Sequence, residues 1–400
     1  MAPEWEYSQV ASAEDGERLA SICSQCFISS RDNSQIYSNL IGRENLRVIR
    51  QNQQILGGLA FTPMGQWFGG QRVPMTGIAA VGVAPEYRGT GAAIAMMKHA
   101  VKELHSQGVA ISVLYPAVHQ LYRQAGYEQG GHYCVWEIPT GSIQLREQPL
   151  PMIPVDCSDL RSAHQRSYRM MQDIYQKQAR LNNGNLDRNQ FIWQTMTRAD
   201  GEEIIYAYLI GTADQPQGYI IFKQEREHNS TYLKVIDWSV LTTAAAQSFW
   251  SFLNHHRSQI DLVRWKSSPL DSLTLLLPEP KAKLKTADRW MLRIVDVTIA
   301  LEERGYPAGV ETELHLEVRD DLIGTNSGKY ILSIANAKGE VTSGGKGQLK
   351  LDIRGLAPLY TGLFTPQQLQ LAGLLEGEDT ALSAAAQIFA ASSPWMSNFF

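Results

Sequence analysis

The spacing of apolar residues in the first 150 positions predicts a domain in which strands and helices alternate. Five segments with β-branched or alternating apolar residues are predicted as strands: 46–51, 54–61, 73–83, 109–115 and 133–138. A first helix is predicted after Ser12, a second begins near Ala92 and ends at Gly108, and a short third helix carries Tyr122. This order of hairpin, strand, helix, strand, helix and strand places residues 1–150 in the α/β (α+β) class.

A second region repeats this alternation after a proline-rich stretch, 147–154, which predicts a linker. Helices are predicted at 167–178, at 189–196 and from Thr242 onward, and strands at 204–209, 217–224, 232–240 and 262–266. Because this order of elements resembles that of the first region, we predict a second copy of the same domain at 151–292.

The pattern changes at about Leu292, and the last region is predicted to form an antiparallel sheet with helices on one face. Alternating apolar residues predict strands at 313–318, 329–334 and 348–353, with helical spacing at 366–375 and 380–389. Residues 293–400 resemble sterol-carrier-like domains. Their apolar stripes are interpreted as core rather than as a lipid tunnel.

The junction between the strand at 73–83 and the next helix has the composition of an anion-binding turn. It reads Arg88-Gly89-Thr90-Gly91-Ala92-Ala93-Ile94. The first turn of a helix leaves backbone N–H groups unpaired and carries the positive end of the helix dipole, and small residues let a phosphate approach closely. Arg88 adds a charged fork that suits phosphate oxygens. The turn therefore predicts a pyrophosphate site.

Two other phosphate-binding motifs fit this turn poorly. A P-loop requires Lys and then Ser or Thr after the glycines, and no such pair follows Gly91. A dinucleotide fingerprint needs a third glycine, where Ile94 stands, and an acidic residue on the next strand, where 109–115 has none. An ordinary strand-to-helix turn remains the alternative when the turn is considered alone.

The residues around the turn resemble the acetyl-CoA site of the GCN5-related N-acetyltransferases. The match consists of Arg88-x-x-Gly91-x-Ala93, the preceding segment 81–85 and the later segment Tyr122-Arg-Gln-Ala-Gly-Tyr127. The resemblance implies that acetyl-CoA is the cosubstrate, with its pyrophosphate on the turn and its pantetheine on backbone groups of the strand. The implied cofactor-binding residues are Val81, Gly82, Val83, Arg88, Gly89, Thr90, Gly91, Ala92, Ala93, Ile94, Tyr122 and Arg123.

Amide formation from a thioester needs a polarised carbonyl and a proton for the departing thiolate. A backbone N–H near Val81 or Val83 can hydrogen-bond the carbonyl as negative charge develops. By the resemblance, Tyr127 is the expected general acid, because a phenol can donate to a thiolate of comparable basicity. Tyr122 is the competing candidate, and a purely structural Tyr127 is the other alternative.

The second copy lacks the residues of the anion-binding turn. Where the first copy has Arg-x-x-Gly-x-Ala, the second reads Leu241-Thr-Thr-Ala-Ala-Ala-Gln247, with neither glycine nor arginine. A helix N-terminus remains there, but the phosphate cradle does not. We therefore predict a degenerate copy that binds no coenzyme A.

Over its full length the chain resembles the enhanced intracellular survival (Eis) family. The resemblance rests on the active copy, the blank second copy, segments 290–297 and 300–306, a predicted turn at 356–362 and the aromatic C-terminus. It implies hexameric acetyltransferases that act on several amines of aminoglycosides. It also implies that the terminal carboxylate, here of Phe400, accepts the amine proton in the active site. A tail that only packs is the alternative.

Charge, apolar runs and cysteine spacing indicate which partners and which cellular compartment to expect. The net charge is −4 without a basic block, so no nucleic-acid partner is expected. The N-terminus lacks the features of a signal peptide and no apolar run approaches membrane-spanning length, so we expect a cytoplasmic protein without membrane association. The four cysteines are interpreted as reduced thiols and no metal is expected, because no second Cys-x-x-Cys or histidine cluster accompanies Cys23 and Cys26.

The nature of the acceptor depends on the charges near the site. A polycationic amine needs several carboxylates, yet segment 27–33 contains Arg31 and a single acid, Asp32, and the tail ends in two phenylalanines. We expect an N-acetyltransferase that acts by direct attack on amines of small polycationic, aminoglycoside-like substrates. The alternative from another class is a non-enzymatic acyl-CoA-binding or lipid-binding carrier or sensor.

Overall fold

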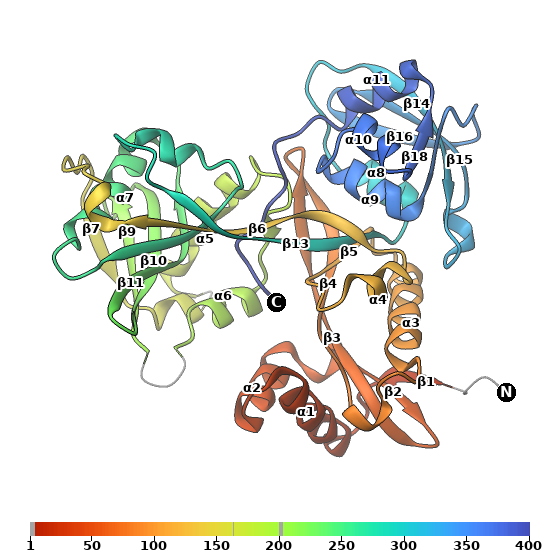
Figure 1. Ribbon diagram of the computed structural model, residues 1–400, viewed down its shortest axis with the longest axis horizontal. Helices are drawn as coiled ribbons and strands as arrows, with labels where there is room; N and C mark the ends of the chain where they lie inside the picture. The colour runs from red at the N-terminus through yellow and green to blue at the C-terminus, as the bar shows by residue number, and fades with distance from the viewer. Residues whose placement is uncertain (1–4, 163, 200–202) are drawn as a thin grey trace. The chain divides into compact units, whose positions relative to one another are not determined.

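The computed structural model describes residues 5–162, 164–199 and 203–400, and the chain divides into two compact units (Figure 1). The first unit contains the chain up to Gly130, Arg289–Ala391 and the last two residues, Phe399–Phe400. The second unit contains Gly131–Asp288 and Ser392–Asn398. The regions at the two ends of the sequence therefore contribute mainly to one unit, and the middle region forms most of the other.

The first unit is built on a sheet with the strand order β1-β2-β3-β4-β5-β13. These strands are β1 (Glu6–Gln9), β2 (Leu46–Gln51), β3 (Gln54–Phe68), β4 (Gln71–Val83), β5 (Ile111–Leu114) and β13 (Lys283–Ile294). The predicted hairpin of β2 and β3 is confirmed, and its two-residue turn has left-handed backbone at Asn52 (φ 50°) and Gln53 (φ 65°). Neighbouring strands pair antiparallel except β4 and β5, which run parallel.

Four helices accompany this sheet: α1 (Ala13–Phe27), α2 (Arg31–Ile41), α3 (Ala92–Ser106) and α4 (His119–Arg123). As predicted, Ser12 caps α1, where its side chain accepts the Asp15 N–H. Figure 1 shows α1 and α2 side by side on one side of β3, with α3 on the other side. Gly58 lets α1 approach the sheet, because a Cβ there would collide with the Leu19 side chain.

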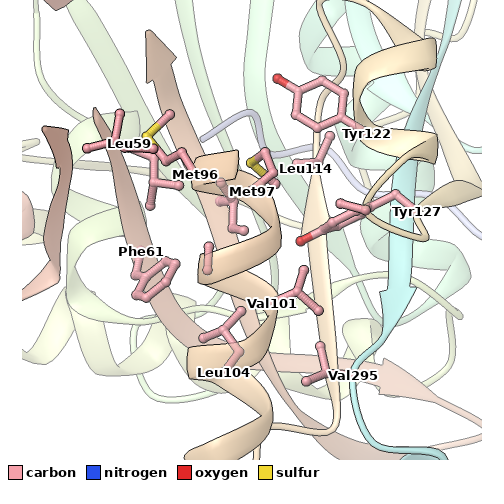
Figure 2. Packing of buried hydrophobic residues seen from close by; sticks show 14 of the residues in the cluster. Leu59, Phe61, Met96, Met97, Val101, Leu104, Leu114, Tyr122, Tyr127 and Val295 are labelled. Carbon is pink, nitrogen blue, oxygen red and sulfur yellow. The ribbon is translucent and has the colours of Figure 1, made fainter. Parts of the chain in front are cut away.

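Helix α3 closes the core of this domain. Its buried residues are Ala92, Met96, Met97, Ala100, Val101 and Leu104. Figure 2 shows this face against Leu59 and Phe61 of β3 and Leu114 of β5. Truncating a core side chain such as Met97 to alanine costs about 2–5 kcal/mol in comparable cores. Ile94, predicted on this face, packs against the cluster but is only half buried, because it lies in the first turn of α3.

The C-terminal part of the first unit forms a separate sheet with the order β16-β15-β14-β17-β18. Its strands are β14 (Thr312–Arg319), β15 (Gly328–Ala335), β16 (Lys338–Ser343), β17 (Leu349–Asp352) and β18 (Leu375–Gly377). Its helices are α8 (Val297–Glu303), α9 (Ile353–Thr361), α10 (Pro366–Leu371) and α11 (Asp379–Ile388). The sheet is mixed rather than antiparallel as predicted, because the β15–β16 hairpin occupies one edge of β14 and β17 returns parallel along the other.

The segment 356–362 was predicted as a turn, which is wrong, because it forms most of α9 and its C-cap. The Asp352 side chain caps this helix by accepting the N–H groups of Arg354 and Gly355. Gly362 ends it in left-handed conformation (φ 75°). Pro358 lies inside the helix, so the usual inference from proline to a helix break fails at this position.

The second unit has the strand order β6-β12-β11-β10-β9-β7, in which β11 and β12 run parallel. Its strands are β6 (Glu128–Pro139), which begins in the first unit, β7 (Met152–Val155), β8 (Leu186–Asp187), β9 (Ile205–Gly211), β10 (Pro216–Glu227), β11 (Ser230–Val240) and β12 (Leu262–Ser267). Its helices are α5 (Arg166–Ala179), α6 (Gln190–Met196) and α7 (Thr243–His255). Part of the predicted linker is β7, which tolerates Pro154 because β7 lies at the edge of the sheet.

Several smaller features complete the fold. Short 3-10 helices occur at Arg43–Asn45 (η1), Pro85–Tyr87 (η2), Thr140–Ser142 (η3), Asp159–Arg161 (η4), Ser272–Leu276 (η5) and Gly324–Asn326 (η6). All four cysteines are free thiols. Across the described ranges, no group of His, Cys, Asp and Glu side chains is arranged to hold a metal ion, and no helix has the length and apolar character needed to cross a membrane.

Candidate functional site

The candidate site begins where β4 and β5 separate. The two strands pair in parallel only over residues 75–77 and 111–113. Farther along β4 the register against β3 slips by one residue, so that Ala80 and Val81 together face Leu59 in a β-bulge. Ala80 takes left-handed backbone (φ 51°) at this bulge. Beyond the paired stretch, the edge of β4 that faced β5 can offer its backbone groups to a ligand.

The N-terminus of α3 forms an open cradle soon after β4. Gly91 is the N-cap with φ 92°, and Gly89 has φ 79°, which are conformations that favour glycine. A Cβ at either glycine would meet nothing within 4 Å, so the space around both is open. No side chain caps α3, and the Ala95 N–H makes a bond to the Gly91 carbonyl. The N–H groups of residues 92–94 are therefore available to an anion.

Arg88 lies at the edge of this cradle with an exposed side chain. Its Nε donates to the Val83 carbonyl oxygen (3.4 Å) and its Nη2 to Cys26 Sγ (3.7 Å). The first contact is long and the second goes to sulfur, a weak acceptor, so the guanidinium is held weakly and keeps donors for a phosphate. The Thr90 hydroxyl donates to the Tyr87 carbonyl (2.7 Å), which ties the turn together from within.

Arg123, which the resemblance assigned to cofactor binding, is paired within the chain. Its Nε and Nη2 each donate to the Glu128 carboxylate at 2.8 Å. The hydrogen bond to Glu128 raises the pKa of Arg123. This bidentate pair connects the end of α4 to the start of β6, so it has a clear structural role in holding the segment that carries both candidate tyrosines.

Tyr127 lies in the closed core. Its side chain is 0% exposed, and its hydroxyl donates to Ser112 Oγ (2.8 Å), which in turn donates to the Thr76 carbonyl (2.9 Å). Burial raises the pKa of Tyr127 well above the ordinary range of tyrosine. Figure 2 shows its ring among the apolar side chains, near Val101 and Leu114. A thiolate could reach this hydroxyl only by displacing the core around Ser112.

Tyr122 lies at the boundary of the same core. Its ring meets that of Tyr127 edge-on, with centroids 6.3 Å apart, and burial raises the pKa of Tyr122 to about 12. Tyr122 is 4% exposed, and its hydroxyl, which forms no hydrogen bond within the described ranges, is not one of the fully buried unpaired polar atoms, so the core does not enclose it completely. Figure 2 shows the two hydroxyl groups pointing in different directions. Of the two candidate acids, Tyr122 has the hydroxyl that the core encloses less completely.

A cavity of about 340 Å³ opens beside the β4 bulge. It is lined in part by Leu19, Cys23, Phe27, Tyr37, Ala80, Phe399 and Phe400. The Phe400 ring packs on Gly77 of β4, where a Cβ would collide with it, and Phe399 stacks on Tyr115 with centroids 4.3 Å apart. The end of the chain therefore lies where β4 and β5 begin to separate.

The side chains that line this cavity are all uncharged. Those with polar atoms are hydroxyls, an amide and a thiol, from Ser29, Asn33, Ser34, Ser38, Tyr37 and Cys23. Asp32 is exposed on α2 and does not line the cavity, and the side chain of Arg31 lies outside the described residues. Among the described residues of this lining, no side chain carries a negative charge.

Three residues that position the site were missed in the sequence. Gly77 interrupts an apolar strand, and a glycine in a strand interior marks a close approach by another group, here the Phe400 ring. Ser112 lies in the apolar segment 109–115, where a buried hydroxyl requires a partner, here Tyr127. Cys26, interpreted only as a structural thiol, donates to the Val83 carbonyl (3.4 Å) and touches Arg88.

Three family models match the chain. Residues 9–130 and 184–294 match models of acetyltransferase (GNAT) domains, and residues 297–397 match a model of a sterol carrier protein domain. These matches confirm the predicted fold class of tandem acetyltransferase domains followed by a sterol-carrier-like α+β domain.

Whole-chain relatives carry the same description. The crystal structure of a GCN5-related N-acetyltransferase from Anabaena variabilis is 57% identical and has a TM-score of 0.95, covering 99% of this chain and 100% of that one. An uncharacterized N-acetyltransferase of Streptomyces avermitilis is 27% identical over 353 residues, which is 83% of each chain. The N-acetyltransferase Eis of Mycobacterium tuberculosis is 25% identical over 321 residues, 78% of this chain and 76% of the relative.

Proposed function

We propose that this chain, which belongs to the GCN5-related N-acetyltransferases and uses acetyl-CoA as cosubstrate, acetylates the amine of a small molecule. The transfer takes place at its N-terminal acetyltransferase copy. The observation that carries this assignment is the cradle at the start of α3. It combines unpaired N–H groups, two glycines with open space around them and the weakly held Arg88. A diphosphate supplies the negative oxygens that such a cradle can accept.

The separation of β4 and β5 supports the position proposed for the reacting thioester. With its pyrophosphate on the cradle, coenzyme A would extend its pantetheine along the free edge of β4, near Val81 and Val83. A backbone N–H at the bulge would then hydrogen-bond the thioester carbonyl as negative charge develops on its oxygen. The amine nitrogen attacks the carbonyl carbon, the carbon–sulfur bond breaks, and no covalent enzyme intermediate forms.

We assign the general acid to Tyr122. The departing thiolate takes the phenolic proton, and the less completely enclosed hydroxyl of Tyr122 supports this role better than the hydroxyl of Tyr127. With a pKa of about 12, Tyr122 stays protonated at neutral pH and can act as a donor. Tyr127, the acid expected from the sequence, is reassigned to holding β5 and α4 through Ser112.

We assign the general base to the terminal carboxylate of Phe400. An α-carboxylate with a pKa of about 3.5 is ionised at neutral pH and can accept the proton that the amine loses, directly or through a water. The support is positional, because Phe400 packs on Gly77 and lines the cavity together with Ala80 of the β4 bulge. An amine that binds as the ammonium ion first releases one proton to solvent to become the nucleophile, its second proton passes to the Phe400 carboxylate as the C–N bond forms, and coenzyme A leaves as the thiol.

The resemblance to Eis implies aminoglycoside-like acceptors, and the cavity supports only part of this expectation. One ammonium group can lie beside the Phe400 carboxylate, but the further ammonium groups of a polycation would face uncharged side chains. The aromatic and aliphatic surfaces of Leu19, Phe27 and Tyr37 suit apolar carbon instead. We therefore propose a small amine with one ammonium group and an apolar body as the better acceptor, and aminoglycosides as the poorer one.

Three further predictions concern the carrier alternative, the oligomeric state and the cellular location. The sequence alternative of a non-enzymatic carrier is set aside, because the family of this chain is one of acetyl-transferring enzymes. A hexameric assembly and a cytoplasmic location remain proposals that rest on resemblance and composition. Light scattering after size exclusion would test the hexamer directly.

The test of the function is release of free coenzyme A thiol from acetyl-CoA with a panel of arylalkylamines, alkylamines, polyamines and aminoglycosides. We expect turnover, with the highest kcat/KM for the monoamines that have an apolar body. A preference for aminoglycosides would overturn the acceptor class alone. Binding of coenzyme A without thiol release for any amine would overturn the transfer itself.

A binding experiment tests the cradle separately. Isothermal titration with coenzyme A should show affinity reduced about 10-fold or more in Arg88→Ala, since a hydrogen bond to a charged group contributes about 1.5–3 kcal/mol. Arg166→Ala is the matched control, because Arg166 is an exposed arginine of the second unit that pairs with Asp214. Equal affinities in the two variants would place the pyrophosphate elsewhere.

A further inference from the structure

The C-terminal tail belongs to two units of the molecule. Its residues Ser392–Asn398 are part of the second unit, whereas Phe399 and Phe400 belong to the first. We propose that the second acetyltransferase copy acts as the receptor for this tail, and that Arg188 is a positioning residue for the Phe400 carboxylate. This proposal rests on the function proposed above, because it concerns the group assigned as the general base.

Backbone hydrogen bonds hold the first part of the tail. The His132 N–H donates to the Pro394 carbonyl (2.8 Å), and the Met396 N–H donates to the His132 carbonyl (3.1 Å). Together they form a parallel β-bridge between His132 and Trp395. A side-chain amide also binds the tail, since Asn185 Nδ2 donates to the Trp395 carbonyl (2.9 Å). The tail is therefore bound as an added strand-like segment of the second unit.

Arg188 contacts the last part of the tail, where the Ser397 hydroxyl also donates to Asp237 Oδ1 (3.4 Å). The Arg188 guanidinium donates from Nε to Asn398 Oδ1 (2.9 Å) and from Nη2 to Ser397 Oγ (3.0 Å). The same guanidinium forms a bidentate pair with Asp237, with both N–O distances 2.7 Å. Its face lies 3.5 Å from the centroid of the Tyr175 ring. All three kinds of contact use the planar, fixed geometry that distinguishes Arg from Lys.

Burial makes this arginine dependent on its partners. The side chains of Arg188 and Asp237 are 0% and 3% exposed. A buried ion pair loses its hydration, so its remaining donors and acceptors must find partners within the protein. The tail supplies two of them through Ser397 and Asn398. The geometry thus selects one position of the tail, at which the network is complete.

Asp237 lies next to a β-bulge in strand β11 of the second copy. The pairing of β10 with β11 slips between Val235 and Asp237, so β11 carries a bulge at Ile236. The first copy has its bulge at Ala80, beside the cavity assigned to the acceptor. The second copy has kept the bulge and uses it to hold an arginine that binds the tail of its own chain.

Asn398, the tail residue that Arg188 holds, lies close in sequence to Phe400, whose carboxylate is the proposed base. Asn398 precedes Phe400 by two peptide links, and consecutive Cα atoms are about 3.8 Å apart, so holding Asn398 confines the Cα of Phe400 to within roughly 7.6 Å of it. A released tail could sample many positions, and the carboxylate would seldom meet the amine. The anchor therefore acts on the rate of proton transfer and not on the binding of acetyl-CoA.

The experiment uses Ser397→Ala/Asn398→Ala, which removes the side-chain contacts of the tail with Arg188 and leaves the Arg188–Asp237 pair intact. We expect kcat to fall about 10-fold, as for the loss of hydrogen bonds to a charged group, with KM for acetyl-CoA unchanged. Carboxypeptidase A should release phenylalanine from this variant faster than from the wild type. The matched control is Ser251→Ala/Asn254→Ala, the same two changes at buried positions of α7 that make no contact with the tail in the described ranges.

A second background separates positioning from general stability. In a chain that lacks Phe400, the Ser397→Ala/Asn398→Ala change should have no further effect on kcat. An equal loss of kcat in the full and the shortened chain would overturn the proposal, as would wild-type kcat in the variant. A wild type without any acetyl transfer would refute the proposed function instead, and the carboxypeptidase time course would still decide the anchoring.

Discussion

The two acetyltransferase copies differ most at the N-terminus of one helix. In the first copy residues 84–91 separate β4 from α3, and the Gly91 N-cap offers no side chain. In the second copy only Leu241 and Thr242 separate β11 from α7, and the Thr242 hydroxyl accepts the Ala245 N–H (3.2 Å). A helix N-terminus binds an anion only when its donors are not already satisfied. The first is open to a ligand, and the second is closed by its own chain.

The strands beside these helices show the same contrast. In each copy the parallel pair begins with three paired residues, 75–77 with 111–113 and 232–234 with 262–264. In the second copy Trp238 then bridges the separating strands, because its indole Nε1 donates to the Lys266 carbonyl (2.8 Å). By this register Trp238 corresponds to Val81 of β4, which has a much smaller side chain. The space that pantetheine would need is filled in the second copy.

The comparison teaches how one fold can hold a substrate in one copy and a segment of its own chain in the other. Both copies have the parallel strand pair and the bulge. They differ in the side chains that cap the helix, fill the gap and pair at the bulge. We propose on this basis that the second copy binds no coenzyme A. Four predictions test the contrast, from the largest expected effect to the smallest.

Replacing Tyr122 with Phe should give the largest effect. The second copy has η5 where the first has α4, and no tyrosine in residues 268–282, so the proposed acid has no counterpart in that segment. Loss of a general acid typically costs about 10²–10⁴ in rate, and kcat should fall in that range with KM for acetyl-CoA nearly unchanged.

Tyr127→Phe is the control for this prediction. It removes a buried hydrogen bond to Ser112, so it should lower the free energy of unfolding by about 1 kcal/mol, with a far smaller change in kcat. The reverse outcome, in which Tyr127→Phe abolishes turnover and Tyr122→Phe does not, would return the acid to Tyr127.

Gly91→Thr converts the open cradle toward the capped helix of the second copy. The added hydroxyl can take an N–H of the first turn, and a β-branched residue at φ 92° strains the turn. Loss of one hydrogen bond to a charged phosphate costs about 1.5–3 kcal/mol, so coenzyme A should bind about 10- to 100-fold more weakly in titration calorimetry.

Gly108→Thr is the matched control, because Gly108 follows the other end of α3 with φ 70° and the same open space around it. It should bear a similar backbone strain while leaving coenzyme A affinity as in the wild type. Equal weakening in both variants would mean that strain in α3, and not the cradle, controls binding.

Thr242→Ala removes the cap of the second copy and should have a smaller effect. Loss of an N-cap side chain costs about 1 kcal/mol in stability, which thermal unfolding can measure. Because Trp238 still fills the gap between β11 and β12, no second coenzyme A should bind. A stoichiometry of two coenzyme A molecules per chain in this variant would show that the cap alone closes the second copy.

The pH profile should show the smallest change. Burial raises the pKa of Tyr122 to about 12, so the phenol stays protonated as the pH rises through about 10, the pKa of an unburied tyrosine. With saturating amine, kcat should therefore not decline between about pH 8 and pH 10. A decline with an apparent pKa near 10, absent from Tyr122→Phe, would mean that the acid is not buried as described.

Local patterns in the sequence predicted most elements because they depend on near neighbours. Ser12, Asn189 and Thr242 cap the helices that they precede. The failures involve residues whose state depends on distant partners. Pro358 is accommodated inside α9, and β17 returns parallel to β14 because the other edge of β14 is occupied.

The sequence by itself determined the fold class and the family, and it predicted the anion-binding turn, because glycine spacing and apolar periodicity act over a few residues. Only the tertiary structure supports the proposed choice of Tyr122 over Tyr127, since the two differ in what surrounds their hydroxyls and not in local pattern. It also decided that Arg188 meets the tail, a contact across 210 positions of sequence. Burial and long-range pairing are properties of the folded chain, and no short pattern specifies them.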